Sequence, residues 1–212
     1  AVAQTHPSER APMQRRAVLT REALVQAGAR EFSTRGYAGA TAKSIAQRAR
    51  VATGSFYQYF PNKDALLQEL ARDRLAWVAE RAFELLGAQH ETPASDRVDA
   101  MRERMRAVVE LVMDYHRQDP GLHAVLTERR HADPDLDAIT GAAERALVER
   151  IASLLERWGH AGDCLAVAHV LLGTLEGSVH AHVLGQAVVS DDRFVRALVG
   201  ALIRIALPEP PE

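Results

Sequence analysis

The sequence predicts an all-α protein of about nine helices that begins with a small three-helix head. No alternating run of Val, Ile, Thr and aromatic residues extends beyond a few positions, so strands are not expected. Apolar residues recur instead at helical spacing along most of the 212 residues. Residue types that start and stop helices punctuate this pattern, and no internal repeat interrupts it.

The head is expected to hold three helices. The first covers about residues 14–34 and ends before Gly36, since glycine is a common helix stop. Its apolar face carries Val25, Gly28, Ala29 and Phe32. Thr41 is a suitable N-cap for the second helix, which has Ile45 and Ala49 in phase. A third, short helix runs from Thr53 to Phe60.

Six further helices are expected in the body. Pro61 ends the third helix and Asn62 caps the fourth, which precedes a loop over residues 87–95. Ser95 or Asp96 opens the fifth. A short sixth helix lies between two prolines, and Asp133 followed by Pro134 marks the start of the seventh. The last three helices are expected over residues 134–158, 163–184 and 191–206, before a frayed tail at 207–212.

The bulk composition, 47% hydrophobic and 25% charged, is that of a soluble globular protein. No apolar run of membrane-spanning length stands out, so we expect no transmembrane helix and no membrane partner. The first 18 residues lack the apolar core of a signal peptide, which argues against export. The single Cys164 excludes an internal disulfide and fits a reducing cytoplasm.

Charge is unevenly distributed along the chain. Residues 1–63 hold ten Lys or Arg against three Asp or Glu, whereas residues 64–212 hold sixteen against twenty-five. A basic front and an acidic body are expected where only the N-terminal part meets a polyanion. The alternative is a charge bias that serves solubility alone.

Two short helices joined by a tight turn in the head predict a helix-turn-helix, whose second helix enters the major groove of DNA. Phe56 and Phe60, four residues apart, are expected in the core of the head. Tyr57 and Tyr59 then project outward, where their hydroxyls suit phosphate contacts, although half-buried packing is the alternative.

Two further residues fit a nucleic-acid surface. Gly54 allows close approach of another backbone. Lys63 falls in the first turn of the fourth helix, where the macrodipole disfavours a cation, and a phosphate bound there would explain its placement.

The segment from Thr20 to Leu70 resembles, without gaps, the DNA-binding head of TetR-family transcriptional regulators. The matching residues are Ala27, Phe32, Gly36, Thr41, Ile45, Ala46, Ala49, Val51, Gly54, Tyr57, Tyr59, Phe60, Lys63 and Leu66. The resemblance implies phosphate contacts by Thr41, Lys43, Tyr57, Tyr59 and Lys63, and base contacts by Thr53, Ser55 and Gln58.

The segment departs from the family pattern at two positions. Arg50 stands where the family usually has Gly, which implies backbone strain if the turn needs a positive φ. Ala52 stands where the family usually has Ser, so the cap of the recognition helix either passes to Thr53 or is lost.

For the body, the resemblance implies a ligand pocket and a two-fold dimer interface made by the last two long helices. The sequence supports dimerisation independently, because the eighth helix is apolar nearly all round and must be covered. Gly173, Gly177, Ala181 and Gly185 form a ridge of small residues that permits close helix contact, either with a partner or within one subunit. The expected interface residues are Gly173, Gly177, Ala181, Phe194, Leu198, Ala201 and Ile205.

The fifth helix carries a Met and Val stripe that is first of all a core stripe, and that also suits a broad hydrophobic ligand. The candidate ligand-binding residues are Trp77, Met101, Met105, Val108, Val112, His116, Trp158, Glu176 and His180. His169, Glu176 and His180 share one face of the eighth helix, as hydrogen-bonded core groups, ligand-orienting groups or metal ligands. Their i, i+7, i+11 spacing is too spread for one ion, so no metal is expected.

The expectation is therefore a non-enzymatic, homodimeric transcription factor, with a DNA-binding domain in residues 1–62 and an effector-binding and dimerisation domain in 63–212. We expect a repressor that a small hydrophobic or amphipathic ligand releases from a palindromic double-stranded DNA operator, with no cofactor. The alternatives are an effector-independent DNA-binding protein and a helical metal-dependent enzyme. No catalytic motif of recognised spacing supports the enzyme.

Overall fold

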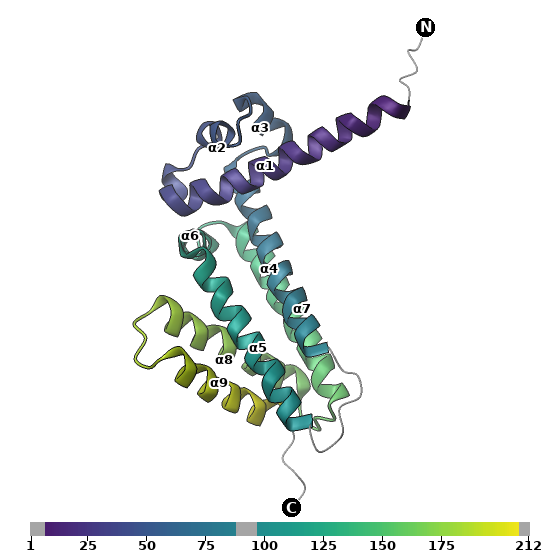
Figure 1. Ribbon diagram of the computed structural model, residues 1–212, viewed down its shortest axis with the longest axis vertical. Coiled ribbons are helices and arrows are strands. Elements are labelled where there is room, and N and C mark those ends of the chain that lie inside the picture. Colours follow the sequence, from purple (N-terminus) through teal and green to yellow (C-terminus); the bar gives the residue numbers. More distant parts are fainter. Residues whose placement is uncertain (1–6, 88–96, 208–212) are drawn as a thin grey trace, which may run out of the picture. The chain divides into compact units, whose positions relative to one another are not determined.

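A computed structural model describes residues 7–87 and 97–207, and in these ranges the chain forms nine helices and no strand (Figure 1). The helices are α1 Pro7–Gly39, α2 Ala42–Arg48, α3 Thr53–Tyr59, α4 Lys63–Gly87, α5 Arg97–Gln118, α6 Pro120–Arg130, α7 Pro134–Arg157, α8 Cys164–Leu184 and α9 Asp191–Ala206. The all-α prediction is confirmed. The fifth-helix start at Ser95 or Asp96, most of the 87–95 loop and most of the tail lie outside the described residues.

The chain divides into two compact units. The first comprises the chain up to Ala71 together with Gly121–Leu136, and the second comprises Arg72–Pro120 together with the chain from Asp137 onward. The first unit thus continues past residue 62, where the sequence analysis placed the domain boundary, and it includes α6. Residues far apart in the sequence therefore contribute to one core, which the local pattern of residues does not reveal.

The core of the first unit is built on aromatic residues from α1 and α3. Phe32 and Phe56 are fully buried and Phe60 nearly so, as expected. Leu122 and Val125 of α6 belong to the same core. Burying one large apolar side chain stabilises a fold by about 1.5–3 kcal/mol, so these residues hold α1, α3 and α6 together.

Helix boundaries in the first unit follow the capping signals. Gly36 has φ 66° and breaks α1 as predicted, although the chain is helical again up to Gly39. The Thr41 side chain accepts a hydrogen bond from the N–H of Ser44, and the Ser44 side chain accepts one from the N–H of Thr41. Asn62 caps α4 and Asp133 caps α7 through hydrogen bonds from backbone N–H groups.

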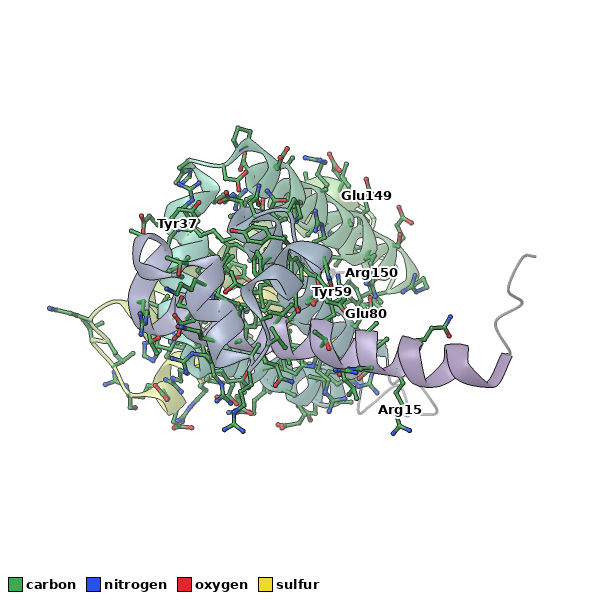
Figure 2. The ribbon with its side chains drawn as sticks, turned by 90° about the horizontal axis from the view of Figure 1, so that it is seen from above. Arg15, Tyr37, Tyr59, Glu80, Glu149 and Arg150 are labelled. Atoms are coloured by element: carbon green, nitrogen blue, oxygen red, sulfur yellow. The ribbon has the colours of Figure 1, made fainter. Side chains whose placement is uncertain are left out.

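In the second unit, α5, α8 and α9 lie side by side (Figure 1). The α5 stripe and the inner faces of α8 and α9 form one apolar core. Arg150 of α7 and Glu80 of α4 lie next to each other (Figure 2), with the Arg150 Nη1 atom 2.6 Å from Glu80 Oε1. The Arg150 guanidinium also covers the Phe83 ring, 3.8 Å from its centre, so α4 and α7 are joined by both charge and stacking.

Helix α8 is the most apolar helix of the chain and leaves much of its surface exposed. By length and composition alone it is apolar enough to cross a membrane, which corrects the expectation that no such segment exists. Only 22% of its most apolar window is buried. Val170 and Leu184 are exposed large apolar residues on it. Exposed apolar surface of this kind favours contact with another surface.

Gly121 lies at a close approach between α6 and α1, which generates a stability prediction. A Cβ atom at Gly121 would lie 2.4 Å from the Ser33 carbonyl oxygen, which is backbone and cannot rotate away. Gly121→Ala should therefore lower the free energy of unfolding by about 1–3 kcal/mol, measured by urea denaturation. The matched control is Gly87→Ala, where a Cβ meets nothing within 4 Å. Equal stability of the two variants would contradict the close approach.

Candidate nucleic-acid interface

The turn between α2 and α3 has the strained geometry that the sequence raised as a possibility. Arg50 has φ 57°, the left-handed region that favours glycine. The Arg50 and Val51 N–H groups donate to the carbonyls of Gln47 and Ala46, which closes the end of α2. The turn is thus held by backbone hydrogen bonds even though a non-glycine residue occupies its positive-φ position.

The recognition helix α3 begins without a side-chain cap. Ala52 occupies the N-cap position and makes no capping hydrogen bond, and Thr53 is the first helical residue. Of the two possibilities raised by Ala52, loss of the cap is confirmed and transfer of the cap to Thr53 is wrong. The position of α3 therefore depends on packing of its inner face, where Phe56 contacts Phe60 with ring centres 5.7 Å apart.

The predicted contact residues differ in exposure. Tyr57 is 57% exposed and projects outward as expected. Tyr59 is half-buried and packs against the core, so the expectation that it projects fully outward is wrong. The other exposed members of the predicted set are Thr41, Lys43, Thr53 and Gln58, and Ser55 is half-buried. The structure thus leaves hydrogen-bonding side chains of α2 and α3 free of the core.

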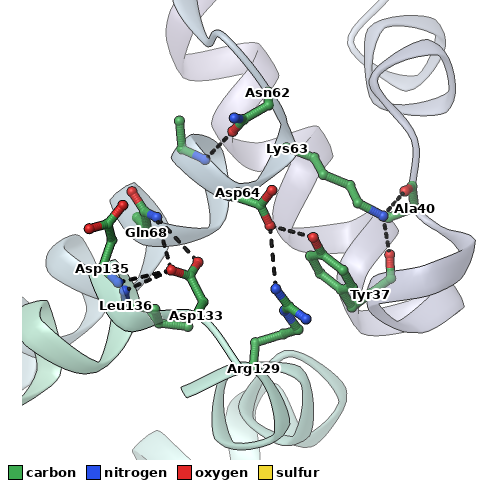
Figure 3. Close-up of polar contacts among 11 residues, drawn as sticks. Tyr37, Ala40, Asn62, Lys63, Asp64, Gln68, Arg129, Asp133, Asp135 and Leu136 are labelled. Carbon is green, nitrogen blue, oxygen red and sulfur yellow. Dashed lines mark hydrogen bonds and ion pairs between the residues drawn. The ribbon is translucent and has the colours of Figure 1, made fainter. Parts of the chain in front are cut away.

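Lys63 has a structural role that corrects the reasoning behind its assignment. Its ammonium donates to the carbonyls of Tyr37, at 2.7 Å, and Ala40, at 3.0 Å (Figure 3). The end of α1 therefore explains a cation at this position without a phosphate, because terminal carbonyls of a helix attract positive charge. An ammonium has three donors, so a third one is left for a phosphate oxygen.

A polar cluster surrounds Tyr37 in the first unit (Figure 3). The Lys63 ammonium and the Arg129 guanidinium each lie 4.0 Å from the centre of the Tyr37 ring. The Tyr37 hydroxyl donates to Asp64, which also pairs with Arg129 at 3.8 Å. Burial, followed by the hydrogen bond and charge of Asp64, raises the pKa of Tyr37 to about 12. The neutral hydroxyl thus remains a donor to the carboxylate.

No local sequence pattern predicts this cluster. Tyr37 and Asp64 are in the head segment, but Arg129 is 65 residues after Asp64 and no local pattern connects them. The role of Glu31 was likewise not predicted: it is buried on α1 and pairs with Arg48 of α2 at 2.6 Å. Hydrogen bonding from Ser44, and then from Arg48, lowers the pKa of Glu31 despite its burial. These pairs fix α2 and α6 against α1.

The candidate ligand-binding residues of the body are dispersed. Met101, Met105, Val108 and Val112 are buried core residues, which supports the core interpretation of the α5 stripe. Trp77 is 50% exposed, and Trp158 is half-buried against the core. A pocket of about 530 Å³ lies elsewhere, lined by residues of α7 and of the start of α8, among them Glu149, Glu156 and Asp163. None of the nine predicted ligand residues lines that pocket.

Three of the nine residues do come together. His116 Nε2 lies 3.7 Å from Glu176 Oε2, and the rings of His116 and His180 are 6.0 Å apart and nearly perpendicular. Burial lowers the pKa of His116, whereas burial and the Glu144 carboxylate raise the pKa of Glu176. His169, which the sequence analysis grouped with Glu176 and His180, is exposed on α8.

The ridge of small residues is open at three of its four positions, since a Cβ atom at Gly185 would lie 2.3 Å from the Ala181 carbonyl oxygen of the same helix. A Cβ atom at Gly173 or Gly177 would meet nothing within 4 Å, and Ala181 is exposed. This geometry disfavours the alternative of tight packing inside one subunit. Of the α9 residues expected at the interface, Phe194, Ala201 and Ile205 are half-buried. Leu198 is only 6% exposed and belongs to the core of its own subunit, which corrects its assignment to an interface.

The fold and the head define a helix-turn-helix DNA-binding protein, and comparison with known families places it more closely. The family described as "Bacterial regulatory proteins, tetR family" matches residues 24–70. A second, the "Tetracyclin repressor-like, C-terminal domain", matches residues 100–204. The two matches together span most of the chain, which belongs to the TetR family of DNA-binding transcriptional regulators.

Similar proteins are regulators as well. The chain is 39% identical over 93 residues to the HTH-type transcriptional regulator BetI of Burkholderia thailandensis, a match that covers 43% of each chain. It is 35% identical over 66 residues to the HTH-type transcriptional repressor KstR2 of Mycolicibacterium smegmatis, covering 31% of this chain and 32% of that protein. The chain thus matches less than half the length of these two relatives.

Solved structures share the fold over nearly the whole chain. A TetR-family protein from Mesorhizobium loti has a TM-score of 0.73 at 18% identity, covering 90% of this chain and 98% of its own. A transcriptional regulator from Saccharomonospora viridis in complex with choline has a TM-score of 0.67 at 19% identity, covering 87% and 95%.

The positions of Lys63 and Tyr57 generate a prediction about affinity. Lys63→Ala should weaken binding to all DNA sequences alike and reduce the slope of log K against log salt by about 0.9, because one phosphate contact is lost. Tyr57→Phe should also weaken binding to all sequences alike, but leave the slope unchanged because no charge is removed. Binding titrations at several salt concentrations measure both. If a variant loses affinity for only one DNA sequence, the assignment of Lys63 and Tyr57 to phosphate contacts is contradicted.

The position of Ser55 generates a prediction about specificity. A larger polar side chain on the groove-facing side of α3 should alter base contacts, so Ser55→Gln should change operator preference by about 1 kcal/mol per affected base pair. Sequencing of DNA selected from a random pool by each protein measures this. The matched control is Gln47→Ala, an exposed α2 residue outside the predicted set. If Ser55→Gln selects the same sequences as the wild type, Ser55 does not face bases.

Proposed function

We propose that this chain is a homodimeric repressor that a small hydrophobic or amphipathic ligand releases from a palindromic operator. The observation that carries the proposal is the difference between the surfaces of the two units. The basic first unit presents Lys43, Thr53 and Tyr57 on α2 and α3, and the second unit has an uncovered apolar face on α8. The first feature suits DNA and the second suits a second copy of the chain.

The DNA side of the proposal assigns contacts to the eight residues expected from sequence. Exposed hydroxyl and amide groups on α3 suit base edges in the major groove, and Lys43 and Thr41 near the start of α2 suit the phosphate backbone. A head this small covers one half-site. Two joined heads therefore favour a palindromic operator with half-sites about one helical turn apart.

The dimer side assigns the interface to the outer face of α8 with parts of α9. Gly173, Gly177 and Ala181 allow a partner helix to approach closely, and Val170 and Leu184 supply apolar area around them. An isologous interface places the same ridge on both subunits, so the two ridges face each other across the two-fold axis.

Ligand control is supported by a structural neighbour whose fold holds choline. The direct test is release from DNA: operator selected from a random pool is bound to the protein, and candidate ligands are added. Choline and medium-chain fatty acids are suitable probes because the first is a small organic cation and the second are small amphipathic anions. Control by ligand is supported if one of these probes releases the protein from operator DNA and binds more tightly to the DNA-free protein than to the DNA complex.

A second candidate function is effector-independent DNA binding. It is favoured by 27% identity over 172 residues to the nucleoid occlusion factor SlmA of Photobacterium profundum, which covers 77% of this chain and 83% of that protein. Chromosome-wide mapping of binding sites separates the two functions. Few sites near promoters support the repressor, and many dispersed sites with no effect on transcription support the second function. Either function places the protein in the cytoplasm, where the DNA is.

The open ridge generates a prediction about assembly. Gly177→Leu should break the dimer, because overpacking a close helix contact costs about 1–3 kcal/mol and a two-fold interface meets the change twice. The isolated subunit should remain folded, since a Cβ atom at Gly177 meets nothing within 4 Å and the position is exposed. Sedimentation, circular dichroism and operator binding measure the three consequences. Gly87→Leu, another open position, is the matched control. A dimeric Gly177→Leu variant that binds operator normally would contradict the assignment.

A further inference from the structure

Arg50 occupies a backbone position that favours glycine. Its N–H donates to the Gln47 carbonyl oxygen, with the two atoms 3.1 Å apart. The next N–H, of Val51, donates to the Ala46 carbonyl oxygen at 3.0 Å. These two hydrogen bonds form the Schellman motif that ends many helices, and its left-handed position is usually glycine. Arg50 has φ 57° at that position, a conformation that is unfavourable for a residue with a Cβ atom.

The Arg50 side chain makes no contact that explains an arginine there. It is exposed, and its guanidinium has neither an ion pair nor a hydrogen-bond partner among the described residues. Arg48, two residues earlier, differs because Glu31 pairs with it at 2.6 Å. Arg48 also supplies the cation that the carbonyl end of α2 favours. Backbone strain that no contact of the side chain compensates is a feature of functional residues.

The segment around Arg50 is basic. Residues 41–60, which include α2, the turn and α3, hold Lys43, Arg48 and Arg50 and no Asp or Glu. Because Arg48 is paired, Lys43 and Arg50 are the cations of this segment that have no ion pair among the described residues. Both are exposed. Exposed cations without acidic neighbours in the segment suit a polyanion.

The turn places Arg50 next to the recognition helix (Figure 1). Arg50 is three residues before Thr53, where α3 begins. In a helix-turn-helix the first residues of the recognition helix reach base edges in the major groove. Residues just before that end therefore lie at the border of the groove, where the phosphates are. A guanidinium can donate two parallel hydrogen bonds to one phosphate, whereas the N–H groups of Arg50 and Val51 are already used in closing α2.

We propose that Arg50 binds a phosphate of the DNA backbone at the border of the major groove, in addition to the eight contact residues expected from sequence. The phosphate contact explains why arginine occupies a positive-φ position, since the charge increases DNA affinity although the backbone disfavours it. The proposal rests on DNA binding through α3. It is independent of the repressor role, of the dimer interface and of release by a ligand.

Substitutions at Arg50 test the phosphate contact. Binding to a selected operator and to a duplex of random sequence is titrated at several salt concentrations. For Arg50→Gly, the slope of log K against log salt should fall by about 0.9 per bound subunit on both duplexes. The affinity lost at about 0.1 M salt should then exceed the loss at about 1 M by about eightfold per subunit. Arg50→Lys should keep the wild-type slope, because an ammonium also neutralises a phosphate.

The stability of Arg50→Gly tests whether Arg50 instead serves the fold. Glycine adopts φ 57° without steric cost, so the midpoint of urea denaturation should be no lower than that of the wild type. A lower midpoint would show that the arginine supports the fold, and it would overturn the proposal. Circular dichroism establishes that the variant keeps its helices.

A matched control separates a local contact from net charge. Arg157→Gln removes one exposed cation from α7 in the second unit and should keep the wild-type slope. The proposal is overturned if Arg157→Gln lowers the slope as much as Arg50→Gly does, or if Arg50→Gly loses affinity for the selected operator alone. If wild type and Arg50→Gly bind both duplexes with the same slope, the Arg50 contact is wrong and the proposed function is unaffected.

Discussion

Burial of Phe56 against the core of the first unit is the constraint on which the DNA-binding surface depends. Helix α3 has only seven residues and no side-chain cap, so its own hydrogen bonds do not fix its position. Phe56 is fully buried with Phe32 and sets the rotation of α3 about its axis. That rotation brings Tyr57 to the surface and leaves Tyr59 half-buried. The surface of the recognition helix is therefore a consequence of core packing.

Ion pairs and cation–π contacts then fix the helices around α3. Glu31 and Arg48 join α1 to α2, and the cluster of Lys63, Asp64 and Arg129 around Tyr37 joins α1, α4 and α6. Arg50 keeps a positive φ, a locally unfavourable backbone conformation that persists only where the surrounding structure holds it. A head of few residues thus obtains a defined shape from a small apolar core and several partly buried charges.

In the second unit, α8 has two faces with different roles. Its inner face joins the core of α5 and α9, and its outer face exposes apolar and small residues at helical spacing. Glu176 and His180 lie beside Gly177 and Ala181 in the sequence, so the polar pair borders the ridge. Its length and apolar composition also make α8 resemble a membrane span, whereas the proposed dimer covers its outer face with a second copy of the chain.

Local sequence determined the helices of this protein and most of their ends. Thr41, Asn62, Asp133 and Asp163 cap helices because a short polar side chain before an apolar run satisfies the first N–H groups wherever the helix lies. Periodicity likewise identified the aromatic core of the head and the α5 stripe.

Tertiary structure alone decided which distant residues meet. Arg129 reaches Tyr37 and Asp64, and α6 joins the first unit, through contacts between segments about 60 residues or more apart. Helical spacing linked His169 to Glu176 and His180, but packing of α5 on α8 brought His116 to them instead. It also placed Leu198 inside the subunit. Spacing along one helix reports which residues share a face, whereas the partner of that face depends on how the helices pack.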